Sequence, residues 1–311
     1  MGGHVVVVGS LSVDFVMRVP RRPQKGETIA GSDFNTFVGG KGNNQALAAA
    51  RAGAKVHMVG RVGTDSYGDR LIETLTRDGI DPQFIFRDKE VGTGIANIYV
   101  DPEGDNSIVI VPQSNARLSR QDVEKAQDII LDAKVVLLQM EIPDDAILAA
   151  AELGQKANAI VILNPAPAPP SGRLPKGLLS YIDLVVPNQT EIALLTGIAA
   201  DTRESAKEAA VLLQQQGVAQ VIVTLGEQGA LFINADGKDK MIPSYKVKAV
   251  DSTAAGDAFC GALAAALASG KPIEDAISVG CAAGALAVTR AGAEPSLPTA
   301  SEIEMLMSVS A

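Results

Sequence analysis

The sequence predicts an α/β protein in which helices flank a doubly wound, mostly parallel sheet, with a small antiparallel sheet beside it. Short runs of valine, isoleucine and leucine recur along the chain, and helical patterns lie between most of them. Strands buried on both faces of a parallel sheet are continuously apolar, and their connections need crossover helices. Two other stretches, residues 15–38 and 92–111, instead read as consecutive strands joined by turn signals.

The parallel strands are expected in a regular order. Residues 5–8 are four valines followed by Gly9, which suits a strand that is buried on both faces. Five later segments have the same short, β-branched character: residues 55–60, 134–139, 159–163, 184–186 and 220–225. Helical periodicity falls between several of them: residues 67–78, 146–156 and 203–217. The stretches 15–38 and 92–111 are explained equally well by one added sheet and by two separate surface hairpins.

Composition limits the classes of function. The chain has 311 residues with a net charge of -9, and no basic run offsets the acidic residues. This balance argues against a nucleic-acid or membrane-surface partner. A hydrophobic content of 47% and a charged content of 20% indicate a globular enzyme, and we expect one large domain over residues 1–311.

The two cysteines and the first residues bear on the compartment. Cys260 and Cys281 both lie in small, apolar helical stretches, so we expect buried thiols and no disulfide framework. The N-terminal residues lack a basic segment and run directly into the first strand, and no apolar run reaches the length of a membrane span. These observations favour a cytoplasmic protein.

The most informative segment is 248–260, where a strand is expected to lead into an alanine-rich helix. Ala254, Ala255 and Gly256 would allow a ligand close to the backbone, and the first amides of the helix are suited to hold phosphate. Asp257 would then lie inside a phosphate site and could take a proton from an attacking hydroxyl. Taken alone, a helix-capping role for Asp257 is an equally good interpretation.

A second cluster, residues 39–45, reads Gly-Gly-Lys-Gly-Asn-Asn-Gln and precedes another alanine-rich helix that ends at Gly53. It adds a cation and two side-chain amides to a tight turn. It is no Walker A loop, because Lys41 is followed by Gly42 rather than Ser or Thr, and no Gly-x-Gly-x-x-Gly follows the first strand. P-loop ATPase and dinucleotide-dehydrogenase functions are therefore disfavoured.

Several polar residues stand at expected strand ends. Asp14 comes just past the first strand, where ligands bind in such sheets, although a turn aspartate is the simpler explanation. Asn188 and Glu191 are three residues apart, as for a ligand site or a capping pair. Thr224 ends another strand, where a plain strand-to-turn junction is the alternative. For Glu141 the alternative is a solvated loop charge, and for Asp251 a turn residue.

Together these motifs resemble the ribokinase family, the carbohydrate kinases that include the phosphofructokinase-B type. The resemblance covers nearly the whole chain and keeps its order. The matching segments are residues 8–10 with Asp14, 23–28, 39–45, 60–68, 139–141, 163–168, 187–191, 224–226, 251–257 and 290–298. Each segment alone is a weak signal, but ten in register are specific.

The resemblance implies phosphorylation of D-ribose at O5 by ATP, with Asp257 as general base and the amides of residues 254–257 as an anion hole. The implied sugar-binding residues are Ser12, Asp14, Gly40, Lys41, Gly42, Asn43, Asn44, Glu141 and Asp257. The implied nucleotide-binding residues are Asn188, Thr224, Leu225, Gly226, Glu227, Gln228, Gly229, Ala255, Gly256, Asp257 and Cys281.

The resemblance further implies two metal ions and an oligomer. Mg²⁺ would be held near Glu191, largely through water. An activating K⁺ would be held by a carboxylate and backbone carbonyls of Asp251, Thr253, Ala287, Arg290, Gly292 and Ser296. The small sheet would be a lid over the sugar, formed by about residues 15–38 and 92–111, and its exposed face would pair two chains in a homodimer.

The chain departs from the family pattern at the sugar site. Ser12 stands where an asparagine is common, and Gln113-Ser114 replaces a usual Gly-Ala. Cys281 occupies a position near the adenine that is often polar. A kinase for deoxyribose, fructose, a keto-deoxy sugar acid or a nucleoside is therefore the alternative. The rival from another class is a regulatory module that keeps the fold without catalysis.

Overall fold

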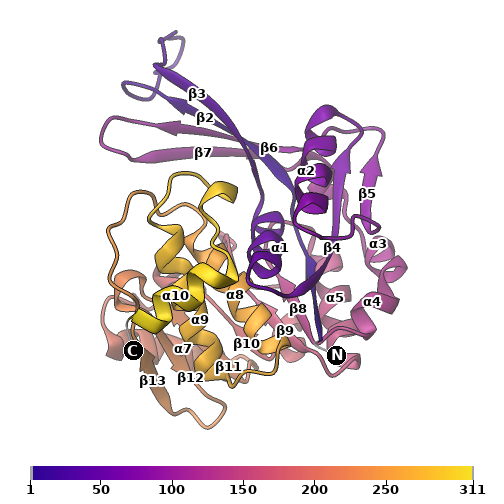
Figure 1. Ribbon diagram of the computed structural model, residues 1–311, viewed down its shortest axis with the longest axis vertical. Helices are drawn as coiled ribbons and strands as arrows, with labels where there is room; N and C mark the ends of the chain where they lie inside the picture. The colour runs from indigo at the N-terminus through magenta and orange to yellow at the C-terminus, as the bar shows by residue number, and fades with distance from the viewer. Residues whose placement is uncertain (1–2, 310–311) are drawn as a thin grey trace.

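The computed structural model describes residues 3–309, and its centre is a sheet of nine strands in the order β13-β12-β11-β10-β9-β8-β1-β4-β5 (Figure 1). All neighbours are parallel except the pairs β11–β12 and β12–β13, which are antiparallel. The strands are β1 (His4–Val8), β4 (Lys55–Gly63), β5 (Ile85–Asp88), β8 (Val135–Leu138), β9 (Ile160–Leu163), β10 (Leu184–Val185), β11 (Gln220–Thr224), β12 (Ala230–Ile233) and β13 (Asp239–Ile242). The predicted fold class is confirmed.

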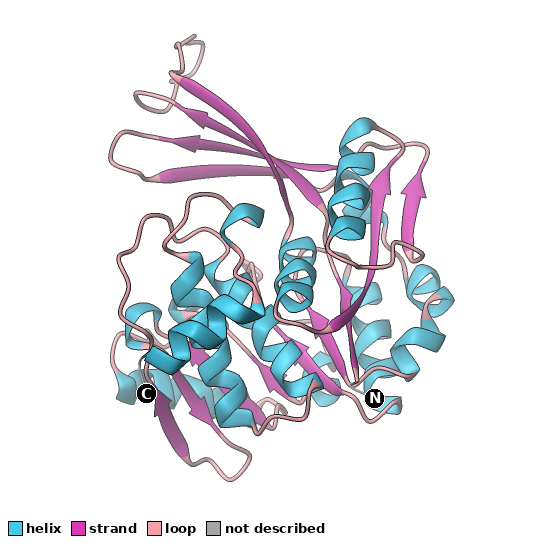
Figure 2. Cartoon of the chain, in the orientation of Figure 1, coloured by secondary structure: helices cyan, strands magenta, loops and turns pink. Residues whose placement is uncertain are grey.

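Helices cover both faces of this sheet (Figure 2). They are α1 (Lys41–Arg51), α2 (Ser66–Arg77), α3 (Arg120–Lys125), α4 (Gln127–Leu131), α5 (Asp144–Lys156), α6 (Gln189–Thr196), α7 (Arg203–Gln215), α8 (Ala255–Ala268), α9 (Ile273–Ala287) and α10 (Ala300–Val309). Four short 3₁₀ turns join them: η1 (Gln113–Arg117), η2 (Leu178–Tyr181), η3 (Gly226–Gln228) and η4 (Glu294–Ser296). The helices predicted at residues 67–78, 146–156 and 203–217 are α2, α5 and α7.

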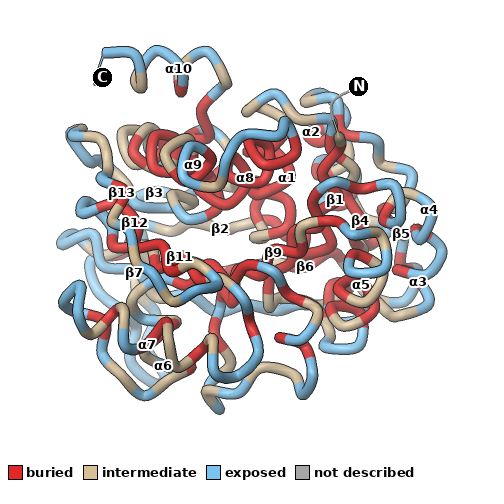
Figure 3. The backbone as a smooth tube through the Cα atoms, turned by 90° about the horizontal axis from the view of Figure 1, so that it is seen from below, coloured by how far each residue is buried: buried red, intermediate tan, exposed pale blue. Residues whose placement is uncertain are grey.

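The valines of β1 divide the core into two layers. Val5 and Val7 pack in a cluster with residues of α1, α8 and α9, whereas Val6 and Val8 pack with residues of α3, α5 and α7. Successive side chains of a strand point to opposite faces, so a strand with helices on both sides needs apolar residues throughout. In Figure 3 the buried residues follow the central strands and α8 and α9, while α10 is mostly exposed.

The second sheet has four strands in the order β3-β2-β6-β7 and projects above the main body in Figure 1. Its strands are β2 (Ser12–Arg18), β3 (Asp33–Gly39), β6 (Gly94–Val100) and β7 (Asn106–Val111). The pairs β2–β3 and β6–β7 are antiparallel, and the central pair β2–β6 is parallel. The alternative of two separate hairpins is therefore wrong, because β2 and β6 hydrogen-bond along their whole length.

Two sequence expectations about strands need correction. The strand expected before α8 is absent, since residues 243–252 belong to no helix or strand, and Val250 is 65% exposed. An apolar side chain left in water contributes little to holding a strand in a sheet. The strands β5 and β13 at the two edges of the main sheet were not predicted from the sequence as strands, because they are short and only partly apolar, with the sequences Ile-Phe-Arg-Asp and Asp-Lys-Met-Ile.

Candidate active site

A cavity of about 580 Å³ lies between the small sheet and the edge of the main sheet where the parallel strands end. One side is polar and comes from β2, the start of α1, the segment after β8 and the start of α8. The other side is apolar and comes mainly from β6 and β7. The lining residues are Ser12, Asp14, Gly40, Lys41, Asn44, Ala96, Ile98, Ile108, Ile110, Pro112, Ala116, Met140, Glu141, Ile142, Pro143, Pro167, Thr253, Ala254, Asp257 and Ala293.

Asp257 lies in the first turn of α8 and is only 6% exposed. Its Oδ1 accepts a hydrogen bond from Gln45 Nε2 at 2.9 Å, and its Oδ2 accepts one from Asn44 Nδ2 at 3.2 Å. The capping alternative is wrong, because α8 has no side-chain cap and its N-cap residue is Ala254. Burial raises the pKa of Asp257, while the nearby Lys41 ammonium and the two amide donors act in the opposite direction.

The start of α8 leaves backbone amides available. Ala254 adopts a left-handed conformation with φ 60°, and the Ala255 amide donates to the Ser252 carbonyl at 3.3 Å. Within residues 3–309, no hydrogen-bond acceptor faces the amides of Gly256 and Asp257. A Cβ added to Gly256 would meet no protein atom within 4 Å. Free amides at the positive end of a helix dipole, with open space before them, are suited to bind an anion.

Asp14 faces the cavity from within a strand, so the alternative interpretation of a turn aspartate is wrong. It is the third residue of β2, and Ser12 Oγ donates to its Oδ1 at 3.3 Å. Gly39 on β3 is directly beside this carboxylate, and a Cβ there would overlap it. Burial raises the pKa of Asp14 to about 6. This position lets one carboxylate accept hydrogen bonds from two neighbouring hydroxyls.

Lys41 and Glu141 form the charged part of the same wall. The Lys41 ammonium is half-buried among carboxylates: burial lowers its pKa, but the carboxylates of Asp257, Glu141 and Glu191 outweigh burial and raise it overall. Glu141 Oε2 accepts hydrogen bonds from the Lys41 amide at 3.0 Å and from Ser10 Oγ at 2.5 Å. Glu141 is therefore tied to the start of α1 and is not simply a solvated loop charge.

Two members of the glycine cluster point away from the cavity. Gly42 packs against the backbone of Gly9 and Ser10, with space for no Cβ. Asn43 is fully buried, and its Oδ1 has no hydrogen-bond partner in residues 3–309. Of the predicted sugar-binding residues, the structure thus brings seven to the cavity wall and puts Gly42 and Asn43 behind it.

Two of the predicted nucleotide-binding segments, which begin at Asn188 and at Thr224, lie next to each other outside the lining of this cavity, whereas Asp257 is part of that lining. Asn188 and Thr224 form an isolated parallel bridge, which joins the start of α6 to the end of β11. Asn188 and Glu191 form a capping box, as the capping alternative predicted. Burial raises the pKa of Glu191, and its carboxylate is within electrostatic reach of Lys41 and Asp257. Glu191 therefore caps α6 and is also close enough to interact electrostatically with the charged groups of the cavity.

The turn after β11 has the geometry of the alternative interpretation, a strand-to-turn junction, and it leads into the β12–β13 hairpin. Leu225 and Gly229 close η3 with an amide-to-carbonyl hydrogen bond of 2.8 Å, and Gly226 and Gly229 have positive φ. Glu227 and Gln228 form the exposed middle of the turn. Cys281 lies on α9, 5% exposed, and burial raises its pKa to about 12. Both cysteines are free and buried, as expected.

Asp251 joins two loops near the start of α8. Its Oδ1 accepts from the Thr253 amide at 2.9 Å and from Thr253 Oγ1 at 2.6 Å, and its Oδ2 accepts from the Gly292 amide at 2.9 Å. Asp251 is thus a turn residue that also fixes the 290s loop. Ala287 accepts the Arg290 amide at 3.2 Å, and Ser296 is fully buried in η4. No group of three or more His, Cys, Asp or Glu in the described part of the chain is arranged for a metal ion.

The sequence reading gave no role to four buried polar residues behind Asp257. They are Ser10, Gln45, Gln139 and Asn164, and they are hydrogen-bonded to Asp257, to Glu141 or to one another. All four occur in the segments that carry the family resemblance, which was the available signal. Their contacts join residues as far as 212 positions apart, so spacing along the chain does not reveal them.

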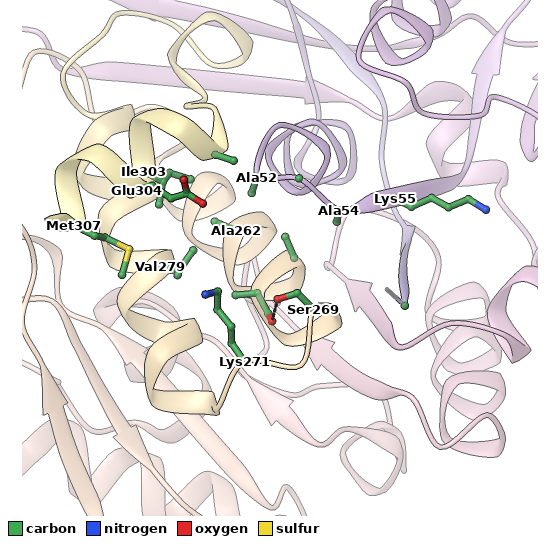
Figure 4. A pocket seen from close by; sticks show the side chains of 15 residues that line it. Ala52, Ala54, Lys55, Ala262, Ser269, Lys271, Val279, Ile303, Glu304 and Met307 are labelled. Carbon is green, nitrogen blue, oxygen red and sulfur yellow. Dashed lines mark hydrogen bonds between the residues drawn. The ribbon is translucent and has the colours of Figure 1, made fainter. Parts of the chain in front are cut away.

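A second cavity of about 490 Å³ lies at the far ends of α1 and α8 (Figure 4). Its walls are mainly small and apolar, such as Ala52, Ala262 and Val279, and the Lys55 side chain points away from it. Among its described lining residues Glu304 is the one carboxylate, so we take the first cavity as the candidate active site. Among the helices of residues 3–309, none has the length and apolar character needed to cross a bilayer.

Comparison with known proteins identifies the family. Residues 3–300 match the pfkB family carbohydrate kinases. A ribokinase of Haemophilus influenzae is 39% identical over 298 residues, 96% of each chain, and a deoxyribokinase of Salmonella typhi is 34% identical over 305 residues, 98% of this chain and 99% of the relative. The structure of Arabidopsis thaliana ribokinase complexed with ribose and ATP has a TM-score of 0.91 at 33% identity and covers 99% of both chains. The chain belongs to the pfkB family of carbohydrate kinases.

Proposed function

We propose that this carbohydrate kinase transfers the γ-phosphoryl group of ATP to O5 of D-ribose, giving D-ribose 5-phosphate and ADP. The observation that carries the proposal is the position of the buried Asp257 carboxylate beside the unoccupied amides at the start of α8. A base and an anion site in contact are what phosphoryl transfer to a hydroxyl requires. The similarity to ribokinases, one of them complexed with ribose and ATP, supports ribose as the sugar.

In the proposed step, the sugar O5 forms a bond to the γ-phosphorus while the bond from that phosphorus to the β,γ-bridging oxygen breaks. The hydroxyl proton passes to Asp257, and the electron pair of the broken bond leaves with ADP. The amides of residues 254–257 stabilise the charge on the transferred group. Raising of the Asp257 pKa by burial makes it a stronger base than an ordinary carboxylate.

The sugar is held by the polar wall of the cavity. Asp14 and Glu141 accept hydrogen bonds from hydroxyls, and Lys41 and Asn44 donate to the sugar oxygens. Ser12 adds one short hydroxyl, and Gly40 allows a close approach of the backbone at φ 87°. Gly42 and Asn43 act behind the wall by shaping the turn. The small sheet then forms a lid, part of one domain, whose Ile108 and Ile110 cover the sugar.

ATP is bound beside this pocket, where Asn188 and Thr224 pair, and it contacts the turn of residues 225–229. Cys281 lies near the adenine. Ala255 and Gly256 lie at the phosphates. Mg²⁺ fits Glu191, whose half-buried carboxylate is within electrostatic reach of Lys41 and Asp257 and accepts a hydrogen bond from the Asn188 amide at 2.9 Å. Mg²⁺ commonly keeps several waters and binds through few carboxylates, so a single Glu191 is sufficient.

K⁺ is proposed beside the anion site, with Asp251, Thr253, Ala287, Arg290, Gly292 and Ser296 as its surroundings. The Asp251 carboxylate accepts three hydrogen bonds, which leaves room for one more ligand on its two oxygens. Bound there, a cation supplies positive charge that holds the turn before α8. Because ATP is the co-substrate, we also propose that the enzyme works in the cytoplasm.

A homodimer through the lid is proposed from its exposed apolar side chains. Phe34, Val109 and Val111 lie on the face of the small sheet away from the cavity and are 56%, 55% and 41% exposed, which is unusual for edge strands in a monomer. Light scattering at micromolar concentration is expected to give twice the mass of one chain. A fully active monomer would exclude the dimer.

Initial rates of ADP formation with a panel of sugars, ATP and Mg²⁺ test the proposed substrate. D-Ribose should have the highest kcat/KM, because a site built for a hydroxyl leaves buried polar groups unpaired when the hydroxyl is missing. Deoxyribose is the second candidate, favoured by the deoxyribokinase relative and by the short Ser12. A higher kcat/KM for deoxyribose, fructose or a nucleoside would replace ribose, and Ser12→Asn should change the ribose value by no more than about tenfold.

A further inference from the structure

Gln45 is a fully buried residue of α1 whose amide touches Asp257 from the side opposite the cavity. Its Nε2 donates to Asp257 Oδ1 at 2.9 Å and to Asn164 Oδ1 at 3.0 Å. Its Oε1 accepts from Gln139 Nε2 at 2.7 Å. Asn44, the other donor to Asp257, lines the cavity, whereas Gln45 does not. Gln45 therefore contacts the carboxylate without access to a substrate.

The neighbours of Gln45 allow its amide only one orientation. Asn164 Nδ2 donates to the Val186 carbonyl at 2.8 Å, which directs Asn164 Oδ1 toward Gln45. With the Gln45 amide reversed, its oxygen would face the oxygens of Asp257 and Asn164, and its nitrogen would face the Gln139 donor. Buried polar groups without partners are costly, so the reversed orientation is excluded while Asp257 is ionised.

Gln139 keeps its own orientation although one of its atoms has no partner. Its Oε1 is a buried acceptor without a hydrogen bond in residues 3–309, and it lies against Gly9, where a Cβ would overlap it. Reversing the Gln139 amide would put two oxygens together at Gln45 and leave a donor unpaired. The glycine after β1 thus makes room for the residue that orients Gln45.

Asp257 is surrounded by charged and titratable groups from several elements, so the source of any pH effect must be separated among them. These groups are Lys41 on α1, Asp14 on β2, Glu141 after β8, Glu191 on α6 and Cys260 on α8. Gln45 is uncharged and is not one of these groups, so it can be substituted without adding or removing a charge around Asp257. Its hydrogen bond favours the ionised form of Asp257, whereas burial opposes that form.

We propose that Gln45 is a positioning residue for phosphoryl transfer: locked by Gln139 and Asn164, its amide holds the Asp257 carboxylate ionised and fixes which oxygen faces the sugar hydroxyl. The inference rests on the proposed role of Asp257 as general base. It assigns to Gln45 no contact with sugar or nucleotide. Its effect therefore belongs to kcat and to the pH at which kcat falls, and not to substrate binding.

The test compares Gln45→Met with the wild type, using the sugar that the wild type phosphorylates best. Methionine keeps the unbranched shape and helix preference but removes the donor. The expected result is a kcat lower by about tenfold or more at neutral pH, an unchanged KM for ATP, and an acidic limb of the pH–kcat profile that moves to higher pH. Raising the pH should recover part of the loss.

Three further variants separate positioning from packing. Gln139→Met frees the Gln45 amide and should move the acidic limb in the same direction by less. Gln45→Glu should move it further, because two adjacent carboxylates share a proton. Gln214→Met is the matched control: Gln214 Nε2 donates to the carbonyls of Ala219 and Asn234, both at 2.8 Å, on the distant α7, and its loss should leave the pH profile unchanged.

A purely structural role predicts another outcome. Gln45→Met would then lower kcat by the same factor at every pH, and also in the Asp257→Asn background, where the proposal expects no further loss; either result overturns it. NMR titration of ¹³C-labelled aspartate carboxyls, with Asp257 assigned by its absence in Asp257→Asn, needs no turnover. A higher Asp257 midpoint in Gln45→Met supports the inference and an unchanged one overturns it, even if no sugar tested were phosphorylated and the proposed function had failed.

Discussion

The helices α1 and α8 begin alike but use their first backbone amides differently. The N-cap residues Gly40 and Ala254 both have positive φ, and neither helix has a side-chain cap. At α1 the amides of residues 41–43 donate to the Glu141 carboxylate and to the hydroxyl and carbonyl of Ser10. At α8 the amides of residues 256 and 257 meet no acceptor in the described part of the chain. One small-residue motif thus serves packing, while the other leaves donors for a ligand.

The glycines of the two motifs show the same contrast. A Cβ on Gly42 would lie 2.6 Å from the backbone carbon of Gly9 and the nitrogen of Ser10, whereas a Cβ on Gly256 would meet nothing within 4 Å. Glycine at the first position is required by the fold. At the second position the described residues leave space for a side chain, so under our proposal glycine there keeps the approach open for the phosphate.

The largest effect on folding is expected for Gly42→Ala. Two backbone segments must move to admit the methyl group, so the free energy of unfolding should fall by about 1–3 kcal/mol or more. Denaturant unfolding measures it, and Gly256→Ala is the matched control. An unchanged midpoint for Gly42→Ala would mean that the contact between α1 and the end of β1 is not tight.

Gly256→Ala should separate activity from stability. Alanine is favoured over glycine inside a helix, so the free energy of unfolding should stay the same or rise by up to about 1 kcal/mol. The methyl group occupies the approach to the free amides, so kcat should fall by at least about tenfold, as for weakened oxyanion stabilisation. Wild-type kinetics in this variant would remove the start of α8 from the phosphate site.

Lowering the pH tests whether the Asp14 carboxylate in the cavity wall binds the sugar. The pKa of Asp14 is raised to about 6, so below this pH the carboxylate takes up a proton and loses acceptor capacity. The KM for the sugar should rise, by roughly tenfold for each pH unit below 6, and Asp14→Asn should abolish this dependence.

Low pH weakens sugar binding through Asp14, but it has the opposite effect on folding stability. The folded protein binds a proton between pH about 6 and the ordinary value of 3.8, where the unfolded chain does not. Its contribution therefore favours folding at low pH and is lost as the pH rises through about 6.

For the sugar-binding prediction, a sugar KM that stays constant from pH 7 to 5 would contradict the assignment of Asp14 to the sugar.

The smallest effect is expected for the cation. Replacing K⁺ by Na⁺ at constant ionic strength should lower kcat by about fivefold, because the ion acts through the order of the turn before α8. Asp251→Ala should remove most of that difference, although it also removes three hydrogen bonds. Equal rates in the two salts would leave Asp251 as a structural turn residue only.

The sequence predicted the parts of the fold that depend on local pattern. The valine run of β1 and the alternation of strands with helices were sufficient for six of the nine strands of the main sheet, β1, β4 and β8 to β11, because burial on both faces leaves a continuous apolar signature. The prediction of a strand before α8 was wrong. Val250 is β-branched but exposed, and residue type alone does not reveal whether a neighbouring strand is present to pair with it.

The site was predictable only in part. Asp257 and Lys41 were predicted as polar residues beside small ones, and Asp14 as a carboxylate just past the first strand, and the structure brings all three to one cavity. Whether a helix amide is free or occupied depends on distant partners, such as Glu141 for the Lys41 amide, 100 residues away. Gln45 likewise depends on distant partners: its orientation is fixed by hydrogen bonds with Gln139 and Asn164, which the sequence does not reveal.

The central claim is that Asp257 takes the proton of the attacking hydroxyl at the start of α8. The most direct test is the turnover of Asp257→Asn with ribose, ATP and Mg²⁺, measured together with its ATP affinity and thermal unfolding. If Asp257 is the base, turnover should fall by a factor on the order of 10² to 10⁴, with ATP binding and the fold retained. Turnover close to that of the wild type would contradict it.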